Sequence, residues 1–230
     1  MSSKKDKSYN LDKYFMSIAI NLASERIGLT GLNPSVGCVI VKNNNILSFG
    51  QTGFNGRPHA EIVAINKCNK KELKNSSIYI TMEPCTHYGK TPPCTNQIIK
   101  SKIKRVIYSI NDVDTRTSNK AYSLLKNKKI YVSKGLLNSE CKKIYKNYFI
   151  QKKNKKPFIA AKIACSSDYF SESKNKFITN KFSRDVSHIL RYKFDAILIS
   201  SKTANTDNPK LTCRINGLED FSPKRLIIDK

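Results

Sequence analysis

The chain has 230 residues, and its 42 Lys and Arg against 17 Asp and Glu give a formal net charge of +25. A hydrophobic content of 39% is enough for a core and excludes a wholly disordered chain, and the length allows one large domain or two small ones. No apolar run approaches the roughly 20 residues that cross a bilayer, and the N-terminus lacks the apolar stretch of a secretory signal. We therefore expect a cytoplasmic protein with no membrane partner.

Periodicity predicts alternating helices and strands over the first 150 residues. A helix capped by Asn10 is predicted to end by Gly28, and a hairpin of strands 36–41 and 46–49 follows. The later elements, in order, are helix 59–69, strand 78–82, helix 93–100, strand 105–110, helix 118–126, strand 130–132 and helix 138–149. This alternation indicates an α/β fold with a layered sheet that is largely parallel after the hairpin.

A polar, cationic stretch, residues 151–157, is closed by Pro157 and predicts a linker. We therefore divide the chain into domains 1–150 and 151–230. The predicted elements of the second domain are strand 158–164, helix 181–191, strand 196–200 and strand 225–228. Because nothing follows that would cover the last strand, we expect this domain to be partial.

The seven cysteines form an odd, irregular set, which favours reduced thiols or metal ligands over a disulfide framework. Cys38 and Cys68 are predicted to be packing residues. The lysines are scattered along the chain, whereas a nucleic-acid footprint is normally a local patch interleaved with aromatic residues. We therefore do not expect nucleic acid as a partner, and a basic surface suits small phosphorylated substrates equally well.

One histidine and two cysteines have the chemistry of a catalytic zinc site. His59, Cys85 and Cys94 supply an imidazole and two thiolates, and three protein ligands leave the fourth position of Zn²⁺ open to water. Glu61 lies two residues after the histidine and is predicted to move protons between that water and a leaving group. A closed structural zinc site with His87 as fourth ligand, or no metal at all, remain the alternatives.

The order His-x-Glu, then Pro-Cys and a second Cys, resembles the signature of zinc-dependent nucleobase deaminases, except that eight residues separate the two cysteines. Residues 84–94, with their long insert, closely resemble the bifunctional riboflavin-biosynthesis deaminase/reductase family. Asn33 to Gly37 and Glu83 also resemble that family. The resemblance covers nearly the whole chain.

For the first domain, the resemblance implies the α/β/α sandwich of cytidine deaminases and hydrolysis of the 2-amino group of 2,5-diamino-6-ribosylamino-4(3H)-pyrimidinone 5′-phosphate. His59, Cys85 and Cys94 then hold zinc, Glu61 is catalytic and Asn33 binds the pyrimidine. Two alternative functions remain. The chain could be a tRNA adenosine or cytidine deaminase, or an RNA-binding protein that a structural zinc ion stabilises and that has no catalytic activity.

For the second domain, the resemblance implies part of a dihydrofolate-reductase-like α/β domain that uses NADPH to reduce the ribose. The implied substrate positions are Asn175, Arg191, Leu211 and Arg214, and the implied cofactor positions are Ala164, Phe177, Thr203 and Asp207. Tyr169 replaces a family glycine, and the later glycine-rich cofactor loop is missing, so we expect feeble reductase activity. Family members associate, and a homo-oligomer is expected.

Overall fold

The computed structural model describes residues 4–171 and 178–229 and divides into two compact units, Met1–Phe158 and Ile159–Lys230. Each unit is described by itself. Within the described residues, no helix combines the length and the apolar character that crossing a membrane requires.

The first unit is built on a mixed sheet with the strand order β2-β1-β3-β4-β5. Its strands are β1 (Gly37–Lys42), β2 (Asn45–Gln51), β3 (Ser77–Met82), β4 (Arg105–Ile110) and β5 (Tyr131–Lys134). β1 pairs antiparallel with both β2 and β3, and the pairs β3–β4 and β4–β5 are parallel. The predicted hairpin followed by a parallel sheet is therefore confirmed.

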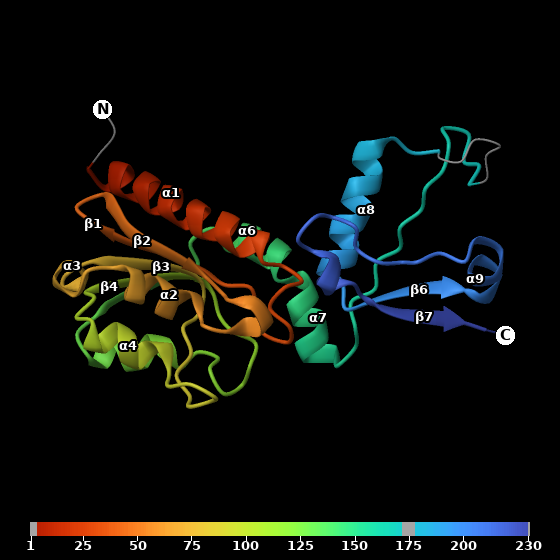
Figure 1. The fold of residues 1–230 in the computed structure, drawn as a ribbon. Coiled ribbons are helices and arrows are strands. Elements are labelled where there is room, and N and C mark those ends of the chain that lie inside the picture. Colours follow the sequence, from red (N-terminus) through yellow and green to blue (C-terminus); the bar gives the residue numbers. More distant parts are fainter. Residues whose placement is uncertain (1–3, 172–177, 230) are drawn as a thin grey trace. The chain divides into compact units, whose positions relative to one another are not determined.

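Helices cover both faces of this sheet (Figure 1). They are α1 (Lys4–Glu25), α2 (Ala60–Lys67), α3 (Lys70–Leu73), α4 (Cys94–Lys100), α5 (Ala121–Asn127), α6 (Asn138–Ile144) and α7 (Lys146–Asn154). α1 packs on β1, β3 and α6, whereas α2 packs on β1, β2 and α4. This arrangement is the α/β/α sandwich that the sequence predicted.

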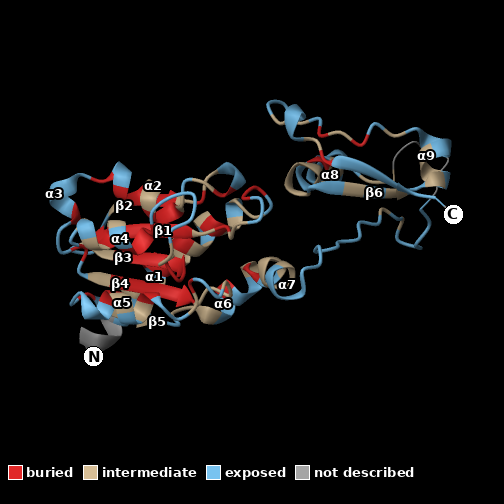
Figure 2. Ribbon diagram, turned by 90° about the horizontal axis from the view of Figure 1, so that it is seen from below, coloured by how far each residue is buried: buried red, intermediate tan, exposed pale blue. Residues whose placement is uncertain are grey.

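Alternation along the strands gives the sheet two apolar faces. On β1, Cys38 and Ile40 join the core beneath α2, whereas Val39 and Val41 join the core beneath α1. All four are buried, as Figure 2 shows for the central strands. Successive side chains of a strand point to opposite faces, so a strand buried on both sides reads as a continuous apolar run.

One glycine sets the distance between α1 and the sheet. A Cβ added to Gly37 would lie 1.8 Å from the carbonyl oxygen of Ala19, so any larger residue would force the helix away. This close approach brings the buried side chains of α1 against β1.

Two helices of the first unit depart from their predicted bounds. α1 begins at Lys4, so Asn10 lies inside the helix and does not cap it. The predicted helix 138–149 is two helices, because Tyr145 leaves the helical conformation at φ −93°, ψ 2° and donates a hydrogen bond from its buried hydroxyl to the carbonyl of Ser35, at 2.9 Å. α7 then continues to Asn154, into the predicted linker, since no proline or glycine intervenes before Pro157.

The second unit contains α8 (Lys181–Lys193), β6 (Ala196–Ser200), α9 (Ser201–Asp207) and β7 (Lys224–Ile228). β6 pairs in parallel with β7 from Ala196–Lys224 to Ser200–Ile228. Asn180 caps α8 and Ser200 caps α9, each accepting a backbone N–H with its side chain. Helix and strands alternate as the sequence predicted for an α/β domain.

The predicted strand 158–164 is wrong. This segment has no ladder partner among the described residues, and most of its side chains are exposed. Apolar residues alone do not make a strand, because an extended chain needs a neighbour to satisfy its backbone groups. The turn after it holds Tyr169 at φ +67°, a conformation that favours glycine.

Candidate metal centre and active site

The three predicted zinc ligands come from three separate segments that meet at one end of the sheet. His59 is the residue before α2, Cys85 follows β3, and Cys94 is the first residue of α4. Their ligand atoms all lie within 4.8 Å of one another. The Nδ1 atom of His59 lies 3.2 Å from Sγ of Cys94 and 3.7 Å from Sγ of Cys85.

Hydrogen bonds favour the thiolate form of Cys85 in this cluster. The hydrogen bond from the Cys94 thiol, together with His59, outweighs burial and lowers the pKa of Cys85 to about 4. The same hydrogen bond to Cys85, together with burial, raises the pKa of Cys94, and the bond to Cys85 also raises the pKa of His59. The cluster thus holds one cysteine that readily forms the thiolate, beside a second sulfur and an imidazole, and these three donors are the set that suits Zn²⁺ once metal displaces their protons.

His87 does not complete a closed site. Among the described residues, the metal-binding cluster consists of His59, Cys85 and Cys94, and Nδ1 of His87 lies instead 3.0 Å from Oγ1 of Thr117. A three-ligand set is typical of a catalytic zinc with one open position.

Glu61 lies buried beside these groups, in the first turn of α2. Burial raises the pKa of its carboxyl group, and His59 opposes this shift. A carboxyl group with a raised pKa releases and accepts protons nearer to neutral pH than an exposed one does. Its chemistry is that of a proton shuttle.

A cavity of about 340 Å³ opens onto the cluster. His59, Glu61 and Cys85 line it, as does Asn33, the residue predicted to bind a pyrimidine. Asn33 approaches Gly56 so closely that a Cβ there would lie 2.0 Å from its Nδ2, and Gly56 holds φ +87°. A glycine is therefore required where Asn33 packs.

The loop after β4 also lines this cavity, which the sequence analysis missed. The lining residues of this loop are Asp112, Asp114, Arg116 and Thr117. The loop directly follows the buried strand β4, and the carboxyl ends of parallel strands meet at one edge of a sheet. The polar residues after strand 105–110 could have been predicted to lie at this site, because they follow a strand that is parallel to the one before Cys85.

Glu83 fastens this loop to the segment that carries Cys85. Its buried carboxylate accepts backbone N–H bonds from Asp112 at 3.3 Å, Asn119 at 3.0 Å and Ala121 at 3.0 Å. Burial raises its pKa, and these three hydrogen bonds oppose the shift. A second tie joins Asp112 to the hydroxyl of Tyr148, at 3.1 Å.

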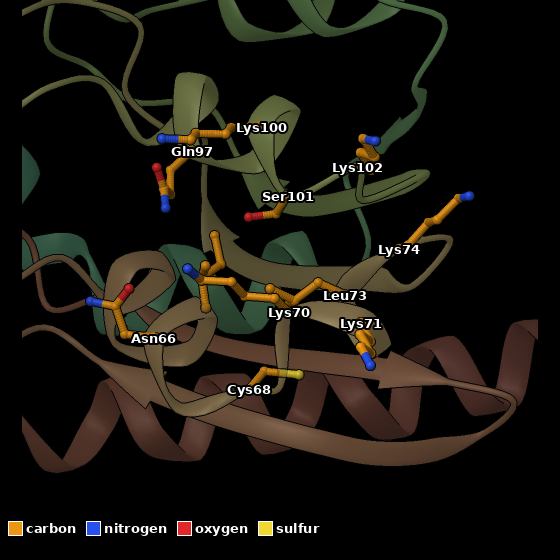
Figure 3. Close-up of a pocket in the computed structure, with 11 residues that line it drawn as sticks. Asn66, Cys68, Lys70, Lys71, Leu73, Lys74, Gln97, Lys100, Ser101 and Lys102 are labelled. Atoms are coloured by element: carbon orange, nitrogen blue, oxygen red, sulfur yellow. The ribbon is translucent and has the colours of Figure 1, made fainter.

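A second hollow, of about 670 Å³, lies beside α3 and the C-terminal ends of α2 and α4. Its basic lining residues are Lys70, Lys71, Lys74, Lys100 and Lys102 (Figure 3). None of the predicted site residues lines it. Lysines near helix C-termini also complement the helix dipole, so the charge alone assigns no ligand.

In the second unit, three predicted substrate residues come together. Arg191 donates to the backbone carbonyl of Thr212 at 3.0 Å, next to the buried Leu211 and the exposed Arg214. The predicted cofactor residues Thr203 and Asp207 lie at the two ends of α9, and Ala164 lies in the segment 158–164. Asn175 and Phe177 lie outside the described residues.

Comparison with known proteins agrees with both units. Residues 9–110 match the family "cytidine and deoxycytidylate deaminase zinc-binding region", and residues 157–230 match the "RibD C-terminal domain". The riboflavin biosynthesis protein RibD of Aquifex aeolicus is 38% identical over 222 residues, which are 95% of this chain and 62% of that protein. The RibD protein of Escherichia coli is 34% identical, over 95% of this chain and 63% of its own length.

A solved structure from Thermotoga maritima matches with a TM-score of 0.86 and 36% identity, covering 97% of this chain and 64% of that one. It is described as a diaminohydroxyphosphoribosylaminopyrimidine deaminase/5-amino-6-(5-phosphoribosylamino)uracil reductase. The present chain thus spans less than two thirds of these relatives.

The first unit combines a cytidine-deaminase-like sandwich with a His, Cys, Cys cluster, which defines a zinc-binding domain of the deaminase type. Over 95% of its length the chain is similar to the riboflavin biosynthesis protein RibD, and its second unit contains a region that matches the RibD C-terminal domain.

Proposed function

We propose that the first unit catalyses the hydrolytic deamination of 2,5-diamino-6-ribosylamino-4(3H)-pyrimidinone 5′-phosphate. The products are ammonia and the corresponding aminouracil. The observation that carries this proposal is the meeting of His59, Cys85 and Cys94 with the buried Glu61 at one cavity. The description of the Thermotoga relative supports the choice of substrate.

His59, through Nδ1, and the sulfurs of Cys85 and Cys94 are the proposed zinc ligands. Bound Zn²⁺ would supply a water of pKa about 7 at neutral pH. Glu61 would take one proton from the attacking water at its carboxylate and deliver it to the leaving amino group, so that the water oxygen bonds to the ring carbon, the C–N bond breaks and ammonia leaves. Asn33 orients the pyrimidine through its side-chain amide.

The wall of the cavity holds cations that a substrate phosphate can bind. Its basic lining residues are Arg57, Lys90, Arg116 and Lys152, and its acidic ones are Glu61, Glu83, Asp112 and Asp114. The Arg116 guanidinium binds Asp114 at 2.6 Å. We therefore propose that Arg57, Lys90 and Lys152, as individual cations and not through a net charge of the cavity, bind the phosphate.

For the second unit we propose the substrate side of an NADPH-dependent ribose reductase, with Arg191 and Arg214 toward the phosphate. Leu211 would contact the substrate, and Ala164, Thr203 and Asp207 are the proposed cofactor positions. The described part of this unit does not offer a glycine-rich backbone cradle for the cofactor pyrophosphate, since Gly217 is the only glycine of the sequence from residue 159 to residue 230.

Ammonia release from the phosphorylated diaminopyrimidine, measured beside zinc content on the same preparation, tests the first proposal. The expected result is turnover with that substrate, about one zinc per chain and no ammonia from tRNA. Ammonia release from tRNA alone would favour the tRNA deaminase, and zinc without turnover on either substrate would favour the non-catalytic protein.

We further propose a cytoplasmic location and a homo-oligomer.

A further inference from the structure

The segment Leu211 to Arg214 is held against α8 by contacts that converge on one histidine. The imidazole Nδ1 of His188 accepts the backbone N–H of Arg214 at 3.2 Å. The backbone carbonyl of His188 accepts the Cys213 thiol at 3.5 Å, and Arg191, one turn further along α8, donates to the Thr212 carbonyl at 3.0 Å.

The guanidinium of Arg191 faces the same imidazole nitrogen. Its Nη1 lies 3.4 Å from Nδ1 of His188, so two N–H groups point at one lone pair. Only a neutral imidazole with its proton on Nε2 has that lone pair free. A protonated ring would turn an N–H toward two donors and oppose both contacts.

Burial and, after it, the charge of Arg214 lower the pKa of Arg191, so the two arginines lie near each other. No salt bridge found within 4–171 and 178–229 includes either of them. Two neighbouring arginines outside these salt bridges offer positive charge to an anion of the phosphate type.

We propose that His188 is a positioning residue of this anion site: its neutral imidazole, as the shared acceptor, fixes Arg214 and Arg191 so that both face one phosphate group. This inference rests on the substrate-phosphate role proposed above for the two arginines. It adds a residue that the sequence analysis did not single out, and it is independent of the deaminase proposal.

The surroundings of His188 keep it neutral. Burial, Arg191 and Arg214 lower its pKa from the ordinary 6.5, whereas a hydrogen bond to the backbone of Thr212 and the charge of Asp185 on the same helix oppose the shift. Since the folded pKa lies below the unfolded one, this contact is fully present above about pH 6.5 and is lost as the pH falls through the folded pKa. Acid should therefore release Arg214 from α8.

Sulfate binding to the whole 230-residue chain tests this role, because sulfate keeps its two negative charges throughout the acid range in which a histidine takes up a proton. The readouts are the NMR signals of the Arg214 amide and the Arg191 Nε–H, and the His188 ring signals report its protonation. The wild-type protein should bind sulfate at these residues at pH 8, and the affinity should fall at least about fivefold once the His188 ring is protonated. Charge alone predicts the opposite, since a protonated histidine would attract the anion.

Three variants complete the experiment. His188→Leu, which has no acceptor, should weaken sulfate binding about tenfold or more, equal to about 1.4 kcal/mol. His188→Asn keeps a neutral acceptor near the Nδ1 position and should bind within about threefold of wild type, without the loss at low pH. Ser187→Ala removes a neighbouring hydroxyl on α8, which donates only to the Ser183 carbonyl of the same helix, and should behave as wild type.

Binding by a folded His188→Leu as tight as wild type would overturn the proposal. If that variant does not fold, the wild-type protein still decides. Affinity that rises or stays constant as the His188 ring protonates, or an absence of sulfate at Arg191 and Arg214, rejects the positioning role. Loss of ammonia release would bear only on the first unit.

Discussion

The backbone N–H of Cys94 donates a hydrogen bond to Sγ of Cys85 at 3.2 Å, although eight residues separate them. Thr95 adds two more bonds, from its backbone N–H at 3.2 Å and its hydroxyl at 3.1 Å, both to the carbonyl of Cys85. The ends of the long insert are therefore pinned together. Its middle is free to line the cavity with His87, Gly89 and Lys90 without disturbing the two sulfurs.

Because hydrogen bonds hold both sulfurs in place, we expect both cysteines to be required for zinc binding. Cys85→Ser and Cys94→Ser are each expected to lower the zinc content of the purified protein by at least about tenfold, since a hydroxyl is a far weaker ligand than a thiolate. Elemental analysis measures this. Cys165→Ser, at an exposed cysteine, should keep its zinc. Full zinc in the Cys85 and Cys94 variants would remove them from the ligand set.

Glu61 is predicted to act on protons and not on the metal. Glu61→Gln should keep zinc while ammonia release falls about 10²- to 10⁴-fold, because an amide of the same shape cannot accept and return a proton. Glu72→Gln, at an exposed carboxylate on α3, is the matched control and should retain wild-type turnover. Turnover near wild type in Glu61→Gln would exclude the proposed shuttle.

The sequence predicted the sheet of the first unit because its signals were redundant. Strand 105–110 matches β4 and is apolar apart from Arg105 and Ser109, as burial on both faces of the sheet favours. The ligand cluster was predictable for a different reason: metal chemistry restricts the choice to a few residue types, so His59, Cys85 and Cys94 stood out before any geometry was known.

What the sequence could not predict depends on partners distant in the chain. Segment 158–164 is as apolar as a strand, yet nothing in its own residues says whether a neighbouring strand is present. The break at Tyr145 depends on a hydrogen bond to Ser35, which lies 110 residues away. The convergence on His188 likewise requires a segment that returns to α8 from beyond β6.

Glu83 was part of the family resemblance, but its role is visible only in the fold. Glu83→Gln offers one carbonyl oxygen where the carboxylate accepts three N–H bonds, so we expect the free energy of unfolding to fall by about 1–3 kcal/mol. Zinc should remain, and KM for the pyrimidine should rise because the 111–121 loop loosens. Denaturant unfolding, zinc analysis and steady-state kinetics measure these effects, with Glu72→Gln as control. An unchanged KM would show that the loop keeps its place without Glu83.

Reductase activity gives the last prediction. The 230-residue chain should oxidise NADPH only feebly in the presence of the deaminated product, because the described part of the second unit offers arginines for a phosphate but no glycine-rich cradle for a dinucleotide. Absorbance at the NADPH band measures the rate, and ammonia release by the same sample shows that the protein is intact. Robust NADPH oxidation that depends on the product, and is lost in Arg191→Ala, would mean that the residues present suffice to bind the cofactor.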